Sequence, residues 1–281
     1  MKVDKTEADK LIEAIGEHSS YDFNQYSEKS FQRRVEKILS DYKLAIDELV
    51  IKLHQDPVFL EEVVKNITVN TTEVFRDTAT WQILKHKVLK KFRDKHGINI
   101  WDIGCSTGQE VYSLLILLNE LELFSKTDVF ATDLNTDVLG VAEKGVYKFR
   151  EIDEFIDNYN KVMCSNPFNE PTHVDVPSEK YFIINRKKNL ITIKPPLLNK
   201  PFFLKHDIVK QGNTFDRKFD IIFCRNVLIY FNHELQNKLF DFFYDNLNTD
   251  GILVLGRHEG MLGEIASKFK KEESIYTKRL V

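Results

Sequence analysis

The chain has 281 residues, which is enough for one large domain or two smaller ones. Its composition, 42% hydrophobic and 30% charged, is that of a globular protein with a sizeable core. The net charge of −3 gives no basic footprint for a polyphosphate, so we expect no nucleic acid as a partner.

Neither the first residues of the chain nor its apolar runs indicate a membrane protein. The first ten residues, MKVDKTEADK, lack the apolar core of a signal peptide, and the run LLILL is far too short to span a bilayer. The cysteines Cys105, Cys164 and Cys224 are far apart and have no zinc-binding C-x-x-C spacing. We therefore expect a cytoplasmic protein with reduced thiols, no membrane insertion and no metal site.

The first 67 residues contain only helical patterns. One helix is predicted after Ser27, a candidate N-cap, because its apolar residues share one face. A second begins with Asp56 as N-cap and Pro57 at the first helical position. These patterns predict a small amphipathic helical bundle.

A short polar connector follows, and its side chains are unusual for a connector. The stretch TVNTTEVFRD brings amide and hydroxyl groups together with an aromatic ring and a guanidinium, at Asn70, Thr71, Thr72, Phe75 and Arg76. A plain turn does not need this set, so we expect the stretch to face a bound ligand.

From residue 81 onward the pattern changes to alternating helices and strands. A helix is expected from Trp81, with Gly97 as its C-cap. Apolar strands then alternate with helices, which predicts a doubly wound parallel sheet. The strands are expected at 98–104, 128–133, 201–208, 219–226 and 251–256. A hairpin at 180–194, preceded by a loop at 165–179, interrupts this order.

The first strand runs into Gly104-x-x-x-Gly108 and then a helix. Such a tight turn lets the backbone approach a ligand, although it also serves simple strand-to-helix packing. The stretch lacks Gly-x-Gly-x-x-Gly and the lysine of a phosphate-binding loop. A phosphate ligand is therefore not expected here.

Polar residues also follow the other strands. Asp133 stands where a ribose-binding acid is found in doubly wound folds, or it caps the next helix unless Asn135 does so. Asp207 and Asn226 end two further strands. Because ligands bind outside the carboxyl ends of such strands, this set indicates a nucleoside site without a phosphate clamp. S-adenosylmethionine fits it better than NAD or ATP.

Four ordered motifs, ITVNTTEVFRDTATWQIL, DIGCSTGQEVYSL, FATDLNTDVLGVAEKGVY and FDIIFCRNVLIYF, resemble those of the CheR-type chemoreceptor glutamate O-methyltransferases. The resemblance implies an α/β protein: an all-helical N-terminal domain, then a doubly wound class I, Rossmann-like methyltransferase domain with a small inserted β-subdomain. The implied boundaries are 1–67 for the helical domain, 68–80 for a linker that lines the cofactor pocket, and 81–281 for the methyltransferase domain, with the β-subdomain at about 177–200.

The resemblance also implies roles for individual residues. Arg76 and Tyr230 are implied near the reacting centre, and Arg33 and Arg34 are expected on the face that docks the substrate. The implied pocket for S-adenosylmethionine and its product S-adenosylhomocysteine comprises Asn70, Thr72, Arg76, Gly104, Gly108, Glu110, Asp133, Asp207, Ile208, Asn226 and Val227.

The implied reaction methylates glutamate side chains in the cytoplasmic domain of a chemotaxis receptor. A glutamate, with a pKa of about 4.3, is already a carboxylate at neutral pH, so the reaction needs alignment and no general base. We expect a monomer. Two alternatives stay open: a same-fold methyltransferase for another protein, an RNA or a small molecule, and a cofactor-binding module without turnover.

Three short stretches depart from the family pattern, and the hairpin region at 180–194 does not match it closely. Val74 precedes Phe75-Arg76 where the family has Phe-Phe-Arg, Gln109 replaces a glutamate, and Gly256-Arg257-His258-Glu259 replaces Gly-His-Ser-Glu. These departures leave the implied cofactor site intact and leave the protein substrate open.

Overall fold

The structure is a computed structural model that describes residues 2–68, 70–149 and 152–279. Contacts divide the chain into two units, Met1–Val69 with Val227–Phe242 and Asn70–Asn226 with Phe243–Val281. Within the described ranges, every helix is too short or too polar to cross a bilayer.

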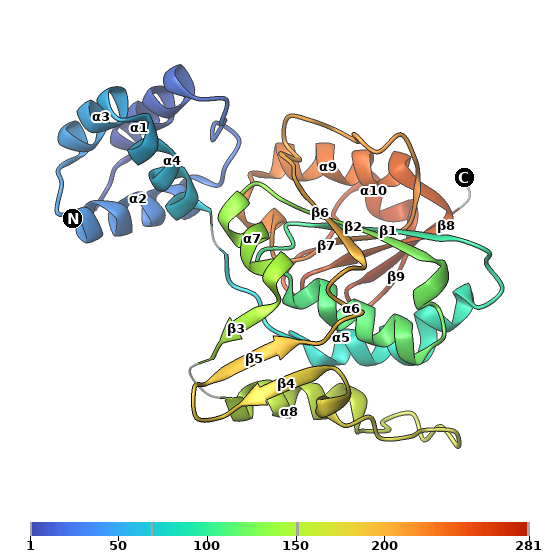
Figure 1. Cartoon of the computed structure of the whole chain (residues 1–281). Helices are drawn as coiled ribbons and strands as arrows, with labels where there is room; N and C mark the ends of the chain where they lie inside the picture. Colours follow the sequence, from blue (N-terminus) through green and yellow to red (C-terminus); the bar gives the residue numbers. More distant parts are fainter. Residues whose placement is uncertain (1, 69, 150–151, 280–281) are drawn as a thin grey trace. The chain divides into compact units, whose positions relative to one another are not determined.

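The N-terminal part of the first unit is helical, as predicted, and contains four helices, two of which the apolar patterns located (Figure 1). They are α1 (Lys5–His18), α2 (Glu28–Tyr42), α3 (Ile46–Gln55) and α4 (Pro57–Ile67). The Asp56 carboxylate accepts hydrogen bonds from the amides of Val58 and Phe59, which confirms it as the N-cap of α4. Ser27 is the N-cap of α2, but its side chain makes no capping hydrogen bond.

Residues 227–242, which the sequence pattern groups with the later strands and helices, belong to this helical unit. They contain a 3-10 helix, Leu228–Tyr230, and the first part of α9 (His233–Asn246). The amide of Ser27 donates to the carbonyl of Tyr230 at 2.8 Å, and the amide of Asn232 donates to Gln25 at 2.9 Å. Backbone pairing therefore anchors this segment beside the start of α2.

The second unit contains a seven-stranded sheet in the order β6-β2-β1-β7-β8-β10-β9. The strands are β1 (Ile98–Ile103), β2 (Thr127–Asp133), β6 (Pro201–Lys205), β7 (Phe219–Cys224), β8 (Leu247–Leu255), β9 (Phe269–Glu272) and β10 (Ile275–Lys278). From β6 to β8 neighbours are parallel, as predicted, whereas β10 is antiparallel to both of its neighbours. The short, charged sequences of β9 and β10 carry no clear strand pattern, so the sequence did not reveal this hairpin.

The centre of the sheet is β1, whose residue Ile100 stands opposite Val129 of β2 and Ile221 of β7. Figure 1 shows α5 (Thr78–Ile83) and α6 (Gln109–Glu120) lying together along one side of this sheet. A buried parallel strand has an almost continuous apolar sequence, which is why β1 could be predicted from the sequence.

The helix expected over residues 81–97 is shorter and less regular than predicted. It begins as α5, continues as a π-helix over Leu84–Val88 and ends as a 3-10 helix over Leu89–Phe92. Two i+3 hydrogen bonds, from Arg93 to Lys90 and from Lys95 to Phe92, close its end. The prediction of Gly97 as the C-cap was therefore wrong, because the helix is already closed and Gly97 directly precedes β1.

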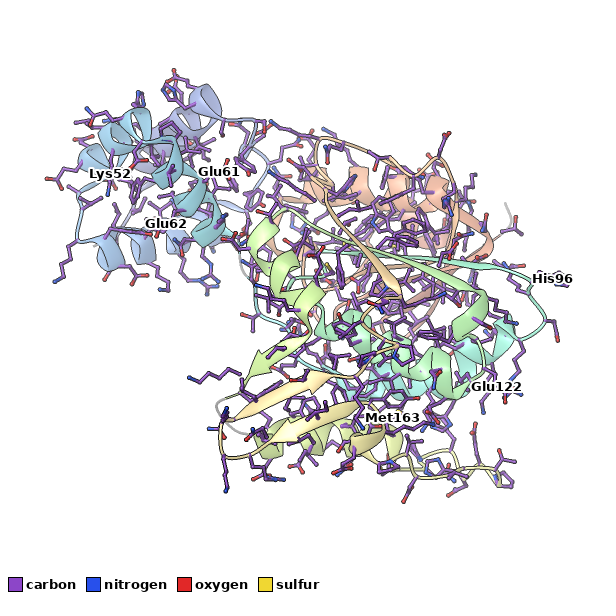
Figure 2. All side chains as sticks on the ribbon, viewed as in Figure 1. Lys52, Glu61, Glu62, His96, Glu122 and Met163 are labelled. Carbon is purple, nitrogen blue, oxygen red and sulfur yellow. The ribbon has the colours of Figure 1, made fainter. Side chains whose placement is uncertain are left out.

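The predicted hairpin forms outside the main sheet, as β4 (Phe182–Asn185) and β5 (Leu190–Ile193). A third strand, β3 (Val146–Lys148), pairs with β5 and completes a small antiparallel sheet. Figure 1 shows α8 (Ile152–Met163) lying along this small sheet. Met163, labelled in Figure 2, is fully buried at the end of α8. The buried residues of the inserted β-subdomain belong to the same hydrophobic cluster as those of the main sheet and its helices.

Candidate active site at the carboxyl ends of the strands

The parallel strands β6, β2, β1 and β7 are neighbours, so their carboxyl ends share one edge of the sheet. Gly104 follows β1, Asp133 ends β2, and Asn226 lies two residues beyond β7. The fold therefore gathers the strand-end residues that the sequence singled out, including Asp207 after β6. Their contacts show what each one does within the protein itself.

The loop between β1 and α6 is a tight, left-handed turn. Gly104 and Gly108 have φ of 77° and 85°, and Ser106 has φ of 51°. A Cβ on Gly108 would lie 2.8 Å from the Cβ of Ala142 in α7 (Thr136–Lys144). Gly108 is thus required by the close approach of α7 as well as by its backbone conformation.

Asp133 fastens this loop to the end of β2. Its Oδ2 accepts a hydrogen bond from the Ser106 amide at 2.8 Å, and its Oδ1 accepts one from the Asn135 amide at 2.9 Å. Burial raises the pKa of the Asp133 carboxyl, and these backbone donors oppose that rise. Of the two candidate caps, Asn135 is the N-cap of α7, and its side chain accepts a hydrogen bond from the Asp137 amide at 2.9 Å.

Arg225, just after β7, is the main site feature that sequence reasoning missed. Its side chain is 1% exposed and forms an ion pair with Glu110 of α6 and another, at 2.9 Å, with Asp77. Its Nη2 also donates to the carbonyl oxygen of Arg76 at 3.0 Å. One buried guanidinium therefore joins the end of β7, the start of α6 and the connector before α5.

That connector is held firmly within the second unit. The amide of Phe75 donates to Ser113 Oγ at 2.9 Å, and the Phe75 ring is fully buried. Trp81 Nε1 donates to the carbonyl of Arg76 at 2.9 Å. Phe75 and Asp77 have φ of 52° and 59°, a conformation that costs about 1–3 kcal/mol for each residue. Strain of this kind gathers at functional sites and is maintained here by the surrounding contacts.

The Arg76 side chain itself is half-buried and its Nη1 donates to the carbonyl of Thr71 at 3.2 Å. The carboxylate of the next residue, Asp77, accepts a hydrogen bond from Arg225 Nη2 at 2.9 Å. Asn70 and Thr72, in the same stretch, are also half-buried.

Asp102, near the end of β1, is a second residue that the sequence analysis did not select. It is 1% exposed, and among the described residues neither of its carboxyl oxygens has a hydrogen-bond partner. Burial raises the pKa of Asp102 well above its usual range, and the nearby charge of Glu110 adds to this. An acid two residues before Gly104, within an apolar strand, was the available signal.

The charge balance of this region fits a cationic ligand. The Asp102 carboxyl interacts there with the charges of Glu110, Asp133 and Arg225. The Arg225 guanidinium also pairs with Glu110 and Asp77, so carboxyl groups outnumber it. S-adenosylmethionine carries a sulfonium and an ammonium group, so an excess of acids suits it. The buried Asp102 carboxyl adds hydrogen-bonding capacity in this region that the described residues leave unused.

Glu259 joins the ends of β7 and β8. Its Oε2 accepts hydrogen bonds from the amides of Asn226, at 2.8 Å, and Gly256, at 2.7 Å. A Cβ on Gly256 would lie 2.9 Å from the Asn226 nitrogen. The first and last residues of the Gly256–Glu259 stretch are therefore structural, whereas Arg257 and His258 are exposed.

Asp207 shapes the turn after β6. Its Oδ1 accepts from the Val209 amide at 3.0 Å, and its own amide donates to the Gln211 side chain at 2.8 Å. Asp207 and Ile208 are half-exposed. The His206 amide donates to the Asp133 carbonyl at 3.0 Å, which links this turn to the end of β2.

Four of the predicted site residues belong to the helical unit. Val227 is the N-cap of the 3-10 helix and Tyr230 is its last residue, while Arg33 is exposed and Arg34 half-buried on α2. Their predicted roles at the site stay predictions.

Two family descriptions match the chain. Residues 70–277 match the description "CheR methyltransferase, SAM binding domain", and residues 6–68 match "CheR methyltransferase, all-alpha domain". The boundary between the two matches falls at the connector that carries Asn70 and Arg76.

Curated bacterial proteins match over most of their length. A Pseudomonas putida protein named as methyltransferase Cher3 is 32% identical over 89% of this chain and 87% of its own length. A chemotaxis protein methyltransferase of Listeria innocua is 29% identical over 86% of this chain and 85% of its own. One from Borreliella burgdorferi is 29% identical over 73% of this chain and 69% of its own.

Proposed function

Because the chain belongs to the CheR methyltransferase family, whose matched domain binds S-adenosylmethionine, we propose that it methylates glutamate side chains of a chemotaxis receptor. The product is a glutamyl methyl ester on the receptor's cytoplasmic domain, a modification suited to sensory adaptation. Relatives named as chemotaxis protein methyltransferases support this assignment.

The observation that carries the proposal is the acidic cluster around Arg225 at the ends of β1, β2 and β7. When bound, S-adenosylmethionine supplies an electrophilic methyl group on a sulfonium. The residues proposed to hold it are Asn70, Thr72, Arg76, Gly104, Gly108, Glu110, Asp133, Asp207, Ile208, Asn226 and Val227. Each carboxylate oxygen of Asp133 accepts one hydrogen bond from a backbone amide. Each oxygen can accept a second one, and a ribose hydroxyl is the proposed donor.

Arg76 is proposed to orient the substrate carboxylate. Its backbone is anchored through Trp81 and Arg225, while its guanidinium has a long bond to Thr71 that a carboxylate can replace. A bidentate pair fixes both the position and the direction of the nucleophile. The pair also stabilises the anion, so it accelerates transfer only if the gain from alignment exceeds that loss.

The remaining two roles lie in the helical unit. Tyr230 is proposed near the reacting centre, and Arg33 and Arg34 are proposed to attract an acidic receptor segment. Complementary charge of this kind mainly raises the rate of encounter.

The test is methyl transfer from radiolabelled S-adenosylmethionine into membranes that contain chemoreceptors from the same cell. We expect receptor labelling that is released as methanol by mild alkali, as an ester requires. Membranes without receptors are the control. Label in another protein, in RNA or in a small molecule supports the same-fold alternative, and cofactor binding without any transfer supports a binding module.

A further inference from the structure

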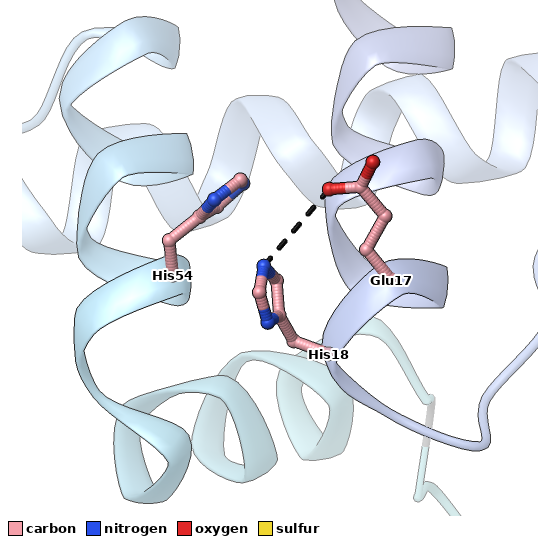
Figure 3. A group of neighbouring side chains, drawn as sticks. All are labelled: Glu17, His18 and His54. Carbon is pink, nitrogen blue, oxygen red and sulfur yellow. Dashed lines mark ion pairs between the residues drawn. The ribbon is translucent and has the colours of Figure 1, made fainter.

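We propose that Glu17, His18 and His54 form a binding site for a divalent transition-metal ion on the helical unit. One ligand atom from each side chain lies within 4.8 Å of the other two. Figure 3 shows the Glu17 carboxylate and the two imidazole rings facing the same gap between α1 and α3. The site is independent of the proposed methyl transfer.

The three side chains come from two helix ends. His18 is the last residue of α1, and His54 stands one residue before the end of α3. The two ring centroids are 4.4 Å apart, and Glu17 Oε2 lies 3.9 Å from His18 Nε2. Zinc bonds of about 2.0–2.2 Å place tetrahedral ligand atoms about 3.4 Å apart. All three side chains are exposed, so small rotations can close the remaining distance.

The helix arrangement favours a cation at this point. Lys10 of α1 pairs with Asp47 of α3 about two turns before the histidines, so the two helices run parallel. Their carboxyl-terminal ends, which carry partial negative charge, therefore come together. Lys52, the neighbouring cation on α3, has its ammonium 3.8 Å above the Phe59 ring of α4. A bound dication would offset both helix dipoles and the Glu17 charge.

The ligand set selects the metal class. Two imidazoles and one carboxylate suit Zn²⁺ and its transition-metal neighbours, whereas Mg²⁺ and Ca²⁺ prefer all-oxygen sites. Three protein ligands leave one tetrahedral position for water. The bound ion would clamp α1 to α3 at their ends and so stabilise the helical unit.

This proposal departs from the expectation of no metal site, which was drawn from cysteine spacing and did not consider these histidines. His18 and His54 lie on different predicted helices and form no short motif. Only the packing of α1 against α3 brings them together.

The test is calorimetric titration of Zn²⁺ into the full chain, without an affinity tag and stripped of metal. We expect one equivalent to bind, and His18→Ala or His54→Ala to weaken binding by at least about tenfold, as for loss of a direct ligand. The matched control is His96→Ala, an exposed histidine of the second unit, labelled in Figure 2, which should leave the affinity unchanged. Co²⁺ should give the visible absorption of a four-coordinate site.

Thermal unfolding provides a second readout. Zn²⁺ should raise the melting temperature of the wild-type chain and leave that of His54→Ala unchanged. Circular dichroism of the metal-free variants establishes that they fold. Should a histidine variant fail to fold, Glu17→Gln, a change at an exposed carboxylate, serves in its place. Wild-type affinity in these variants, an equal loss in His96→Ala, or no saturable binding by the wild type overturns the proposal.

Discussion

At the scale of single residues, Arg225 holds the candidate site together. Its guanidinium forms ion pairs with Glu110 and Asp77 and donates a hydrogen bond to the Arg76 carbonyl. The Arg225 side chain is only 1% exposed. A buried charge without a partner destabilises the folded state, so the Arg225 guanidinium depends on the Glu110 and Asp77 carboxylates, and they depend on it. Deleting this one side chain should therefore affect three chain segments at once.

Arg225→Met tests that position. It leaves Glu110 and Asp77 without their partner, and breaking a buried pair costs about 3–5 kcal/mol of unfolding free energy. Urea denaturation measures the loss. The control is Arg217→Met, an exposed arginine 3.9 Å from Asp128, which should cost at most about 1 kcal/mol. An equal loss of unfolding free energy in both variants would show that the ion pairs of Arg225 contribute no more to stability than the exposed pair of Arg217.

Asp102 should limit stability in the absence of ligand. Its pKa is raised in the folded chain, so the folded state holds a proton that the unfolded state releases. Its contribution is therefore fully present below the unfolded pKa, about 3.9, and falls as pH rises toward the folded value. We expect Asp102→Asn to be more stable than wild type at pH 7, with the difference shrinking toward pH 4.

The same Asp102→Asn variant should bind S-adenosylmethionine more weakly, by about 1.5–3 kcal/mol, if the carboxylate faces the cofactor's cation. Denaturation across pH and calorimetry measure the two effects separately. If Asp102→Asn is more stable than wild type but binds S-adenosylmethionine with unchanged affinity, Asp102 has no role in cofactor binding. Its burial would still explain the effect on stability.

At the scale of elements, the connector before α5 combines a rigid backbone with a replaceable side-chain contact. Phe75 and Asp77 are held in left-handed conformations by contacts to α6 and β7, while Arg76 makes one long bond to Thr71. This is the arrangement that a substrate-orienting arginine needs, because positioning depends on the backbone and binding requires a free guanidinium.

Arg76→Lys should reduce turnover by about 10- to 100-fold, because a point charge cannot reproduce the planar fork. Cofactor affinity and unfolding free energy should change much less. Arg279→Lys is the matched control, since Arg279 also makes one long bond, at 3.4 Å, to a backbone carbonyl. Normal turnover in Arg76→Lys would remove the orienting role.

At the scale of the whole molecule, two units divide the proposed tasks. The acidic strand-end cluster belongs to the second unit, whereas Arg33 and Arg34 belong to the helical one. The net charge of the chain is only −3, so any attraction of an acidic receptor segment must come from local patches.

Changing Arg33 and Arg34 together to glutamate should slow receptor methylation, most strongly at low salt, because steering acts through screened charge. Initial rates across a salt series measure it. The control is Lys2→Glu with Lys5→Glu, the same charge change at exposed positions of the helical unit. If the two double variants behave alike, Arg33 and Arg34 form no specific docking face.

The sequence alone determined the features that depend on neighbouring residues. Apolar periodicity located two of the four N-terminal helices and the five parallel strands, and the predicted cap Asp56 formed. Of the two candidate caps Asp133 and Asn135, Asn135 caps α7. These signals are readable because each depends on residues within about one helical turn or one strand.

Tertiary structure decided the features whose partners are distant in the chain. Arg225 lies 115 residues from Glu110 and 148 residues from Asp77 in the chain. The burial of the Asp102 carboxyl likewise results from the elements that pack around β1. The pairing of β10 with β8 and the His18–His54 pair also depend on packing. No local pattern encodes such pairings, because a charge or an imidazole in sequence reads the same whether its partner is water or a buried group brought close by the fold.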